Sequence, residues 1–441
     1  MSVDACLPPD TSESLCGDWY GKDASLADWL AYLEQLHPKT IDLGLARVAE
    51  VARRLFGNMH FPCILTVAGT NGKGSTCAFL ESMLLHAGYR VGTYTSPHLM
   101  VYNERVRIQG VPVTDDVLVS AFRAVETVRG DVSLTYFEYG TLAAMLIFYQ
   151  AALDVIVLEV GLGGRLDAVN VFDTDCAVIT SIDLDHTEYL GTTREAIGAE
   201  KAGIFRSSVP IICGDSDPPA SLRERARQLV SPWHAVGETF TWRDQADGWD
   251  FVGVSSYYGL PHPGMAGRHQ LNNAAVAIAA LACVRHRLPV HETAIRQGLR
   301  DAWVAGRYQR LPGKPERVFD VAHNPHGARA LADSLHRLPV SGKTFVVLGM
   351  LADKDMAGVV AALRDEVDVW LLAGLDVPRG AGEVQLEAVL LAQGITKHVA
   401  LYPHPALAWQ AACELAHEND RIVTVGSFYT VAAVLQSALE G

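Results

Sequence analysis

The sequence lacks two features that would have pointed to a membrane or a nucleic acid. No apolar run approaches the ~18 to 20 residues that a membrane-spanning helix needs. A surplus of basic residues is also missing, since 36 Lys and Arg stand against 50 Asp and Glu, a net charge of −14. Because nucleic-acid affinity rests on Lys and Arg that neutralise phosphates, this balance argues against a general polyanion binder. An anionic ligand must instead meet a local cluster of donors.

Cysteine is sparse, and its spacing gives no C-x-x-C pair of the kind that binds zinc or exchanges disulfides. The eight cysteines lie mostly in apolar runs, so we expect buried, reduced thiols. They are Cys6, Cys16, Cys63, Cys77, Cys176, Cys213, Cys283 and Cys413. The first residues, MSVDACLPPDTSES, also lack the basic and apolar regions of a signal peptide. The sequence therefore predicts a cytoplasmic protein.

The order of apolar runs predicts an α/β fold. At 441 residues the chain is long enough to bury two or three hydrophobic cores. From residue 61, short β-branched runs alternate with longer amphipathic stretches, which is typical of a parallel sheet covered by helices. The expected strands are 63–68, 91–95, 154–160, 176–182 and 209–213, and the expected helices are 75–88, 138–153 and 193–205. We expect a P-loop doubly wound parallel sheet in an N-terminal domain of residues 1–304.

A second α/β unit is expected toward the C-terminus. Residues 237–264, rich in Trp, Tyr, Gly and Asp, predict a small β excursion or loop, and 270–285 predicts a helix. The stretch AGRYQRLPGK at 305–314 carries three breakers and marks the domain boundary. The alternation then restarts, with expected strands at 317–322, 344–350, 367–373 and 421–426 and a closing helix at 428–439. Residues 305–441 therefore predict a smaller, Rossmann-like α/β domain.

A glycine-rich loop between the first strand and the next helix predicts a phosphate site. The loop comprises Gly69, Thr70, Asn71, Gly72, Lys73, Gly74, Ser75 and Thr76. Its backbone N–H groups can turn inward, the helix N-terminus favours an anion, and Lys73 can reach the terminal phosphates. Val67 stands where the standard motif has its first Gly, and Gly74 directly follows the lysine, which disfavours a motor or switch NTPase. The alternative is a glycine turn without a ligand.

Carboxylate and hydroxyl groups near the same sheet edge suggest a Mg²⁺ site. Glu159 ends an apolar strand in LEVGLGGRLDAVN, and ligands of open α/β sheets bind beyond the carboxyl ends of strands. Ser96 in TSPHL and His186 in SIDLDHTEYLG follow neighbouring strands. We expect the glycines after Glu159 to let phosphate or metal approach the backbone closely; they are Gly161, Gly163 and Gly164. Taken singly, such groups are more often solvated or structural.

Lys201 is a further candidate. It lies in EKAGIF, and the small neighbours Ala202 and Gly203 predict that its side chain points inward. A buried lysine readily loses its proton.

These motifs in this order resemble the Mur ligase superfamily and, within it, the bacterial bifunctional dihydrofolate synthase/folylpolyglutamate synthase family. The similarity extends from about Leu26 to the end of the chain. It is carried by LEQLHPKTIDLGLARV, GTNGKGS, TSPHL, LEVGLGGRLDAVN, LDHTEYLG, EKAGIF, FDVAHNPHGA, GMLADKD and VGSFYTV. The motifs are highly specific in combination.

The resemblance implies ATP and Mg²⁺ at two sites, with room for a monovalent cation. It implies metal ligation by Ser96, Glu159 and His186, and Lys201 as a carbamylated residue bridging the second Mg²⁺. Lys73, Lys201 and His186 are thereby the implied catalytic residues. The implied contacts to ATP beyond the glycine-rich loop are Asn273 to adenine, Arg307 to the phosphates, Asp320 to the ribose and His323 beside the nucleotide.

The resemblance also implies a site for the pteroate moiety, formed by the TIDLGL segment, the TYFEYG turn and the loop after Glu159. The corresponding residues are Thr40, Ile41, Asp42, Leu43, Thr135, Tyr136, Phe137, Glu138, Leu166, Asp167 and Ala168. Apolar walls with one carboxylate acceptor suit a pterin, and Asp167 is the implied acceptor.

The implied reaction is ATP-dependent addition of L-glutamate to dihydropteroate and to reduced folates through an acyl phosphate. The alternatives are a monofunctional folylpolyglutamate synthase, another amide ligase of the superfamily and a P-loop protein that hydrolyses ATP slowly. A ligase for nucleotide-linked cell-wall precursors would need a UDP site, for which we find no added N-terminal domain. Nothing marks a subunit interface, so we expect a monomer whose partners are small molecules, without nucleic acid or membrane.

Overall fold

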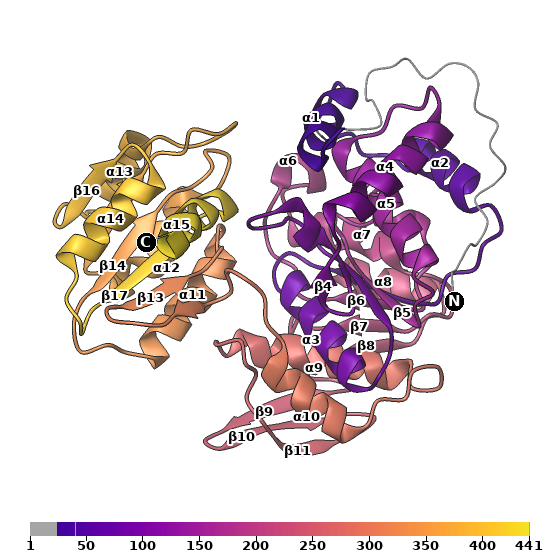
Figure 1. The fold of residues 1–441 in the computed structure, drawn as a ribbon. Coiled ribbons are helices and arrows are strands. Elements are labelled where there is room, and N and C mark those ends of the chain that lie inside the picture. Colours follow the sequence, from indigo (N-terminus) through magenta and orange to yellow (C-terminus); the bar gives the residue numbers. More distant parts are fainter. Residues whose placement is uncertain (1–23, 40, 441) are drawn as a thin grey trace.

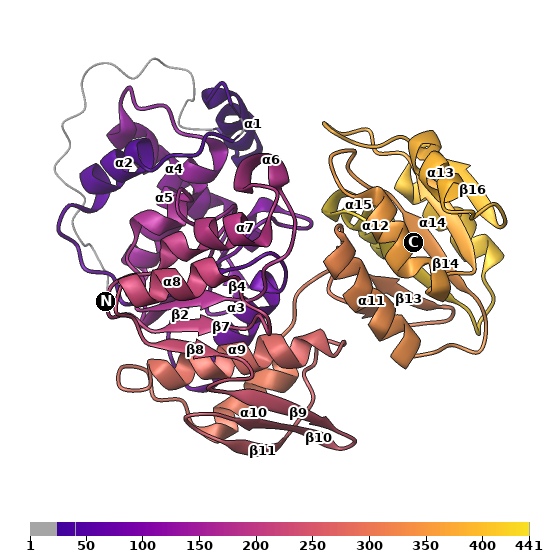
Figure 2. The same cartoon turned by 180° about the vertical axis from the view of Figure 1, so that it is seen from behind.

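A computed structural model describes residues 24–39 and 41–440 (Figure 1). Within them the chain forms β-sheets of eight, three and six strands. The eight-stranded and six-stranded sheets lie in two lobes that stand side by side in both views (Figures 1 and 2). The three-stranded sheet adjoins the lobe of the eight-stranded sheet.

The first sheet has a parallel centre, in the strand order β4-β3-β2-β5-β1-β6-β7-β8. Its strands are β1 (Cys63–Ala68), β2 (Val91–Tyr94), β3 (Val106–Ile108), β4 (Val111–Pro112), β5 (Val155–Glu159), β6 (Cys176–Ile179), β7 (Ile211–Cys213) and β8 (Trp233–Ala235). All five strands expected here are present, shorter at their ends by at most three residues. The antiparallel edge β3 and β4 and the strand β8 were not expected.

Helices cover both faces of this sheet, because successive strand side chains point to opposite faces. In β1, Ile64 and Ala68 belong to one core, whereas Leu65 and Val67 belong to the other. The first core contains α1 (Leu26–Leu36), α2 (Ala46–Phe56), α4 (Asp115–Arg129), α5 (Tyr136–Gln150), α7 (Arg194–Lys201) and α8 (Ala220–Gln228). The second contains α3 (Lys73–His86), α9 (His269–Cys283) and α10 (Glu292–Asp301). Because these strands are buried on both faces of the sheet, they appear in the sequence as continuous apolar runs.

Short helical segments and a small sheet complete this lobe. The segments are η1 (Tyr102–Arg105), η2 (Ala168–Val171), α6 (Thr187–Leu190) and η3 (Ala202–Ile204), and the antiparallel sheet consists of β9 (Thr241–Gln245), β10 (Gly248–Val252) and β11 (Tyr257–Leu260). The expected β excursion at 237–264 is therefore confirmed. Its aromatic residues Phe240, Trp249 and Phe251 join the core of α9 and α10.

The second sheet has the order β12-β13-β17-β14-β15-β16 and is parallel except at β12. Its strands are β12 (Gln309–Leu311), β13 (Glu316–Phe319), β14 (Thr344–Leu348), β15 (Val369–Ala373), β16 (Val399–Tyr402) and β17 (Arg421–Val425). Its helices are α11 (Pro325–Arg337), α12 (Met356–Leu363), η4 (Arg364–Glu366), α13 (Glu383–Ala392), α14 (Pro405–Leu415) and α15 (Phe428–Glu440). The segment 305–314, expected to be a boundary with breakers, thus contains an edge strand of the second sheet.

The cysteine expectation holds in part. Cys63, Cys77, Cys176 and Cys213 are buried and free, but Cys413 is exposed, because it lies on the outer face of α14. Cys283 is half-buried, and Cys6 and Cys16 lie outside the described residues. None of the helices in the described ranges is long and apolar enough to cross a membrane.

Candidate active site

The glycine-rich loop connects β1 to α3 and is fastened to the residues that follow β6. Thr70 N donates to Ser181 O at 2.7 Å, and Thr180 Oγ1 donates to Asn71 O at 2.6 Å. Gly69 and Gly72 adopt φ of +150° and +88°, and a Cβ at Gly69 would lie on the Thr180 hydroxyl. Only glycine fits such a backbone at this close approach. The loop is therefore rigidly presented at the carboxyl end of the first sheet.

Lys73 opens α3 and is a cation without a carboxylate partner among the described residues. Its Nζ donates to the carbonyl oxygens of Gly69 and Thr70 at 3.2 and 3.3 Å. This geometry curls the ammonium group back over the loop. The charge is thus available to an anion bound there.

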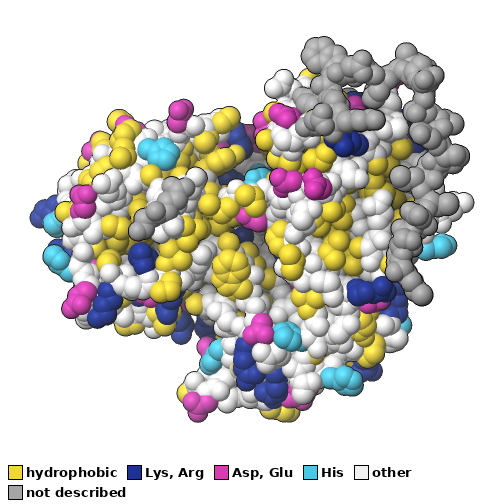
Figure 3. All heavy atoms as spheres, in the orientation of Figure 1, with side chains coloured by type: hydrophobic (Ala, Val, Ile, Leu, Met, Phe, Trp, Pro, Cys, Tyr) yellow, Lys and Arg dark blue, Asp and Glu magenta, His cyan; other side chains and the backbone are white. Residues whose placement is uncertain are grey.

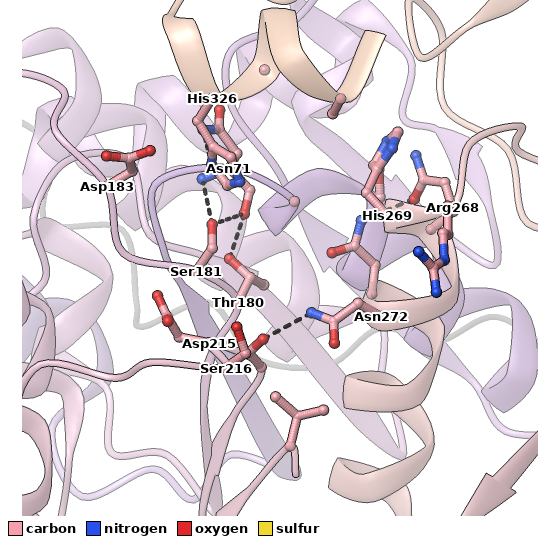
Figure 4. A pocket seen from close by; sticks show the side chains of 18 of the residues that line it. Asn71, Thr180, Ser181, Asp183, Asp215, Ser216, Arg268, His269, Asn272 and His326 are labelled. Atoms are coloured by element: carbon pink, nitrogen blue, oxygen red, sulfur yellow. Dashed lines mark hydrogen bonds between the residues drawn. The ribbon is translucent and has the colours of Figure 1, made fainter. Parts of the chain in front are cut away.

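A cavity of about 1070 Å³ lies on one side of the loop (Figure 4). One wall carries Asn71, Thr180 and Ser181, and the other carries Arg268 and His269 (Figure 4). Of the predicted ATP contacts, those lining it are Asn71, Gly72, Ser75, Asn273, Arg307, Asp320 and His323. The two sheets thus contribute to one cavity of a size suited to a nucleotide.

Two of these residues are already hydrogen-bonded within the protein. Asn273 Nδ2 donates to Gln270 Oε1 at 2.9 Å. Asp320 accepts from the backbone N–H of Tyr308 and Ala322 at 2.9 and 2.8 Å. Burial raises the pKa of Asp320, while the nearby charge of Arg307 opposes that rise. Both residues are held in fixed positions at the cavity wall.

A second cavity, of about 630 Å³, lies on the other side of the loop. It shares Asn71, Gly72, Arg307 and His323 with the first, so the two cavities meet at the glycine-rich loop. The surface is hollowed between the two lobes (Figure 3). The predicted residues that line the second cavity are Ile41, Asp42, Leu43, Gly69, Thr70, Lys73, Gly74, Ser96, Thr135, Phe137, Glu138, Glu159, Leu166, Asp167, Ala168, His186 and Lys201.

Glu159 ends β5 and is only 4% exposed. One carboxylate oxygen, Oε2, accepts from Ser96 N at 3.2 Å. Burial raises the pKa of Glu159, and the charge of Lys73 opposes the rise. Ser96 follows β2, which neighbours β5, so the predicted juxtaposition of these two residues is present.

His186 lies after β6 with φ of +51°, a conformation that is uncommon for a residue other than glycine. Burial, with the charge of Lys354, lowers its pKa to about 4 despite the opposing carboxylate of Asp185. The imidazole is therefore neutral near pH 7, as a metal ligand must be.

Lys201 ends α7 with its side chain 4% exposed, as its small neighbours predicted. Burial, and next the charge of Lys73, lower its pKa to about 7. Within the described residues it has neither a hydrogen bond nor an ion pair from its side chain. A buried, readily deprotonated and unpaired amine is suited to carbamylation.

The donor set suits a hard cation that completes its shell with substrate oxygens. Among the described residues, no three His, Cys, Asp or Glu side chains come together to hold a metal. Mg²⁺ needs only one or two carboxylates beside phosphates and water. Glu159, with one oxygen that accepts no hydrogen bond from the described residues, satisfies that requirement beside the phosphate loop.

The glycines after Glu159 have a packing role that we did not expect. A Cβ at Gly161 would lie 2.6 Å from the Phe137 ring, and one at Gly164 would lie 2.9 Å from the carbonyl oxygens of Glu200 and Lys201. A Cβ at Gly163 would lie 2.9 Å from Leu190. These glycines therefore allow the loop to pack against protein. Gly161 and Gly163 also line the second cavity, so the expectation that they let phosphate or metal approach stays a prediction.

The TYFEYG segment is not a turn but the start of a helix. Thr135 is the N-cap of α5, and its hydroxyl accepts from Glu138 N at 3.2 Å while Glu138 caps Thr135 N in return. This capping box is the reason that the segment is helical. Thr135, Phe137 and Glu138 line the cavity, whereas the Tyr136 ring packs against Tyr102 and Arg105.

Of the carboxylates in this part of the cavity, Asp42 and Glu138 are neutralised by Arg47, at 2.6 and 3.1 Å. Asp167 accepts from the backbone N–H of Leu162 and Val169, and burial raises its pKa to about 6. It has no cationic side chain as a hydrogen-bonding partner among the described residues. Thr40 lies outside those residues.

Sequence reasoning missed a set of contacts that joins the two lobes. Asp185 accepts from Lys354 Nζ at 2.6 Å and from Asn324 Nδ2 at 3.0 Å. Asn71 Nδ2 donates to Asn324 Oδ1 at 3.2 Å. Lys354 lies in GMLADKD and Asn324 in FDVAHNPHGA, two motifs that carried the resemblance, but neither residue had an assigned role. Their pairing with loops of the first lobe could not be read from spacing.

Together, the two sheets, the phosphate loop and the shared cavities define a nucleotide-binding α/β protein with its site between two lobes. The sequence matches "Mur ligase middle domain" over residues 67–281 and "Mur ligase, glutamate ligase domain" over residues 306–428. It is 48% identical to the dihydrofolate synthase/folylpolyglutamate synthase of Escherichia coli K12 over 93% of this chain and 95% of that protein.

Solved structures give the same result. The structure "E.coli FolC in complex with DHPP and ADP" superposes with a TM-score of 0.90 at 46% identity, covering 95% of this chain and 98% of that one. A bifunctional folylpolyglutamate synthase/dihydrofolate synthase "with Mn, AMPPNP and L-Glutamate bound" superposes with a TM-score of 0.87 at 45% identity, covering 95% and 99%. The chain therefore belongs to the dihydrofolate synthase/folylpolyglutamate synthase family of Mur ligases and is an ATP-dependent glutamate ligase.

Proposed function

We propose that this protein adds L-glutamate both to dihydropteroate, making dihydrofolate, and to reduced folates, making folylpolyglutamates. The observation that carries the proposal is the second cavity. It is lined both by the phosphate loop and by Phe137 and Asp167, two of the residues predicted to bind the pteroate moiety. A carboxylate held beside the γ-phosphate of ATP is the arrangement that activation requires. We further propose that residues 1–304 and 305–441 act as two domains and that the protein works as a monomer.

The proposed chemistry proceeds through an acyl phosphate. A carboxylate resists attack by an amine because its carbonyl is electron-rich and oxide is a poor leaving group. Transfer of the γ-phosphoryl group to the acceptor carboxylate gives an acyl phosphate, and the amine of glutamate then displaces phosphate. The products are an amide, ADP and phosphate. Positioning and electrostatics account for such catalysis without a covalent enzyme intermediate.

Lys73 and Arg307 have clear roles in this proposal. Both are cations without carboxylate partners in the described chain, and both line the cavity in which the phosphates would lie. Their charges would stabilise the developing negative charge on the transferring group. Asn273, Asp320 and His323 would hold the nucleoside, and Asp167 would accept hydrogen bonds from the pterin ring.

Ser96, Glu159, His186 and a carbamylated Lys201 would hold Mg²⁺ at two sites. When bound, the cations would neutralise charge on the phosphates. The support from this chain is the buried carboxylate of Glu159, the neutral imidazole of His186 and the unpaired, buried amine of Lys201.

Release of ADP by the purified protein tests the proposal. Mg·ATP and glutamate are supplied with dihydropteroate, with a reduced folate, or with no acceptor. We expect ADP release with each acceptor and little without one. Release with the folate alone would indicate a monofunctional folylpolyglutamate synthase, and release with neither would contradict the proposal.

A further inference from the structure

A fixed cation, Arg105, lies at the wall of the second cavity. Arg105 ends η1, and its carbonyl oxygen accepts from Thr95 N at 2.9 Å, which ties it to the chain just before Ser96. Its guanidinium lies over the rings of Tyr102 and Tyr136, 5.3 and 5.5 Å from their centroids. Such contacts fix the orientation of the guanidinium plane and leave the N–H groups at its edge available as hydrogen-bond donors.

A histidine fixes the remaining freedom of this side chain. Arg105 Nε donates to His98 Nδ1 at 2.8 Å, so that nitrogen carries no proton. Both residues line the cavity. The guanidinium is therefore held on its inner side by an imidazole nitrogen and two aromatic rings, without a carboxylate.

Its outer side has no partner among the described residues. The two terminal nitrogens of Arg105 donate to no described group, and no carboxylate lies within ion-pair distance of them. The adjacent acid, Glu104, is occupied by three backbone N–H groups, those of Leu99, Met100 and Val101 at 2.7 to 2.9 Å. An arginine fork that faces a cavity without a counterion is suited to binding a carboxylate.

Apart from Lys201, which we assign above to carbamylation, the other cations of the cavity have partners or roles elsewhere. Lys354 pairs with Asp185 at 2.6 Å, and Arg379 pairs with Asp353 at 3.0 Å. Lys73 belongs to the phosphate loop, and Arg307 also lines the nucleotide cavity. Of the described arginines that line this cavity, only Arg105 both lacks a carboxylate partner and lies outside the nucleotide cavity.

The two acceptors of the proposed reaction differ in one charged group. Dihydropteroate ends in a single carboxylate, which is the group that becomes activated. A folate ends in a glutamyl residue with two carboxylates, of which one is activated while the other keeps its charge. A site that serves both acceptors therefore needs a cation for the folate that dihydropteroate does not use.

We propose that Arg105, positioned by His98 and Tyr136, binds the non-reacting carboxylate of the terminal glutamyl residue of a folate acceptor. This inference rests on the proposed function. It makes Arg105 a specificity residue for chain extension, dispensable for the first glutamylation of dihydropteroate.

The test compares Arg105→Gln with the wild type on both acceptors at saturating ATP and glutamate. Because a hydrogen-bonded charge pair is lost, we expect the KM for the folate to rise roughly 10- to 100-fold. The KM for dihydropteroate should change by less than about threefold. Equilibrium binding of each acceptor in the presence of ADP, followed by fluorescence, should show the same difference. Arg105→Lys, which keeps the charge, should recover part of the folate affinity.

A matched control is Arg90→Gln, at the opposite end of β2, where an exposed arginine pairs with Asp154. It should leave both reactions unchanged. Equal losses of Arg105→Gln with both acceptors would overturn the inference and indicate a structural role. A higher KM for glutamate with either acceptor would also overturn it, by assigning Arg105 to the incoming amino acid. A wild type inactive on both acceptors would instead refute the proposed function.

Discussion

Replacing Lys354 by methionine tests whether the two lobes are held together by a buried ion pair. Lys354 Nζ lies 2.6 Å from Asp185 Oδ1, and both side chains are 9% exposed. The pair joins the loop after β6 in the first lobe to the GMLADKD loop of the second. Methionine preserves most of the side-chain volume while removing the charge. Asp185 would then lose its nearest cation.

The size of the effect follows from burial. Removing one partner of a buried ion pair costs about 3–5 kcal/mol, because the remaining charge is uncompensated. Asp185 keeps Asn324 Nδ2 at 3.0 Å and His323 Nε2 at 3.5 Å, which favours the low end. About 3 kcal/mol corresponds to a factor of about 150 in an equilibrium constant. Since the partners lie in different lobes, we expect the loss in the association of the lobes rather than in the folding of either.

The carboxylate of Asp185 is ionised near neutral pH. Although burial opposes it, the hydrogen bond from His323 and the charges of His186 and Lys354 hold the pKa of Asp185 well below its usual range. A depressed carboxyl pKa gives stability that is present above the unfolded value of about 3.9 and lost only as pH falls further. Between pH 6 and 8 the strength of the wild-type ion pair should therefore not depend on the titration of Asp185.

Three measurements check this prediction. The kcat/KM for ADP release should fall roughly 100-fold with every acceptor. Small-angle scattering with ADP and acceptor should show a larger radius of gyration than the wild type. Equilibrium unfolding of each lobe should change little. Arg337→Met, which removes an exposed i,i+4 pair with Asp333 within α11, should alter none of these, because such pairs contribute little.

The reasoning would be refuted if the kcat/KM of Lys354→Met for ADP release lay within about threefold of the wild-type value. It would equally be refuted if activity fell while the scattering stayed unchanged, since the pair would then act in catalysis and not in closure. Adding Asp185→Asn to Lys354→Met should restore part of the compactness, because the uncompensated charge is gone.

Three further predictions follow from the site. Lys73→Ala should lower kcat by roughly 10³-fold or more with an unchanged circular dichroism spectrum, and a folded, active variant would contradict its role. Gly72→Ala should raise the KM for ATP, because φ is +88° and a Cβ would lie 2.5 Å from Asn273 Oδ1, whereas Gly382→Ala, with open space, should not. Because the pKa of Asp167 is raised to about 6, dihydropteroate affinity should be constant above pH 7 and weaken as pH falls through 6, and Asp167→Asn should flatten that profile.

Much of the fold could be predicted because its signals are local. A strand buried on both faces reads as an apolar run, as in Cys63–Ala68, and a helix that follows a glycine loop begins where the loop ends. The edge strands β3, β4 and β8 were missed because they are short and partly exposed, which leaves little apolar pattern. The phosphate loop and the carboxylate of Glu159 were found for the same local reason: each follows a recognisable strand.

What could not be predicted depends on contacts between distant segments. Asp185 looks like a solvated loop acid in the sequence, and its partner Lys354 comes 169 positions later. Tyr136 and Phe137 are neighbours of similar type at the start of α5, yet of the two only Phe137 lines the cavity. The glycines after Glu159 suggested only a ligand, whereas their missing Cβ atoms also make room for Phe137, Leu190 and a helix backbone. Composition cannot distinguish these uses.

The charged groups of the site are of two kinds: those that form ion pairs within the protein, and those that have no oppositely charged partner among the described residues. Asp42 and Glu138 are paired with Arg47, and Asp185 is paired with Lys354, so these carboxylates fix the walls. Lys73, Lys201, Arg105 and Arg307 have no carboxylate partner among the described residues, although they lie in a protein of net charge −14. A buried or half-buried charge without a counterion destabilises the folded protein. Such charges are found where a bound ligand supplies the counterion. Phosphates and an acceptor carboxylate are counterions of the required sign, so the anionic substrates of a ligase would supply the charge that Lys73, Arg105 and Arg307 lack within the protein.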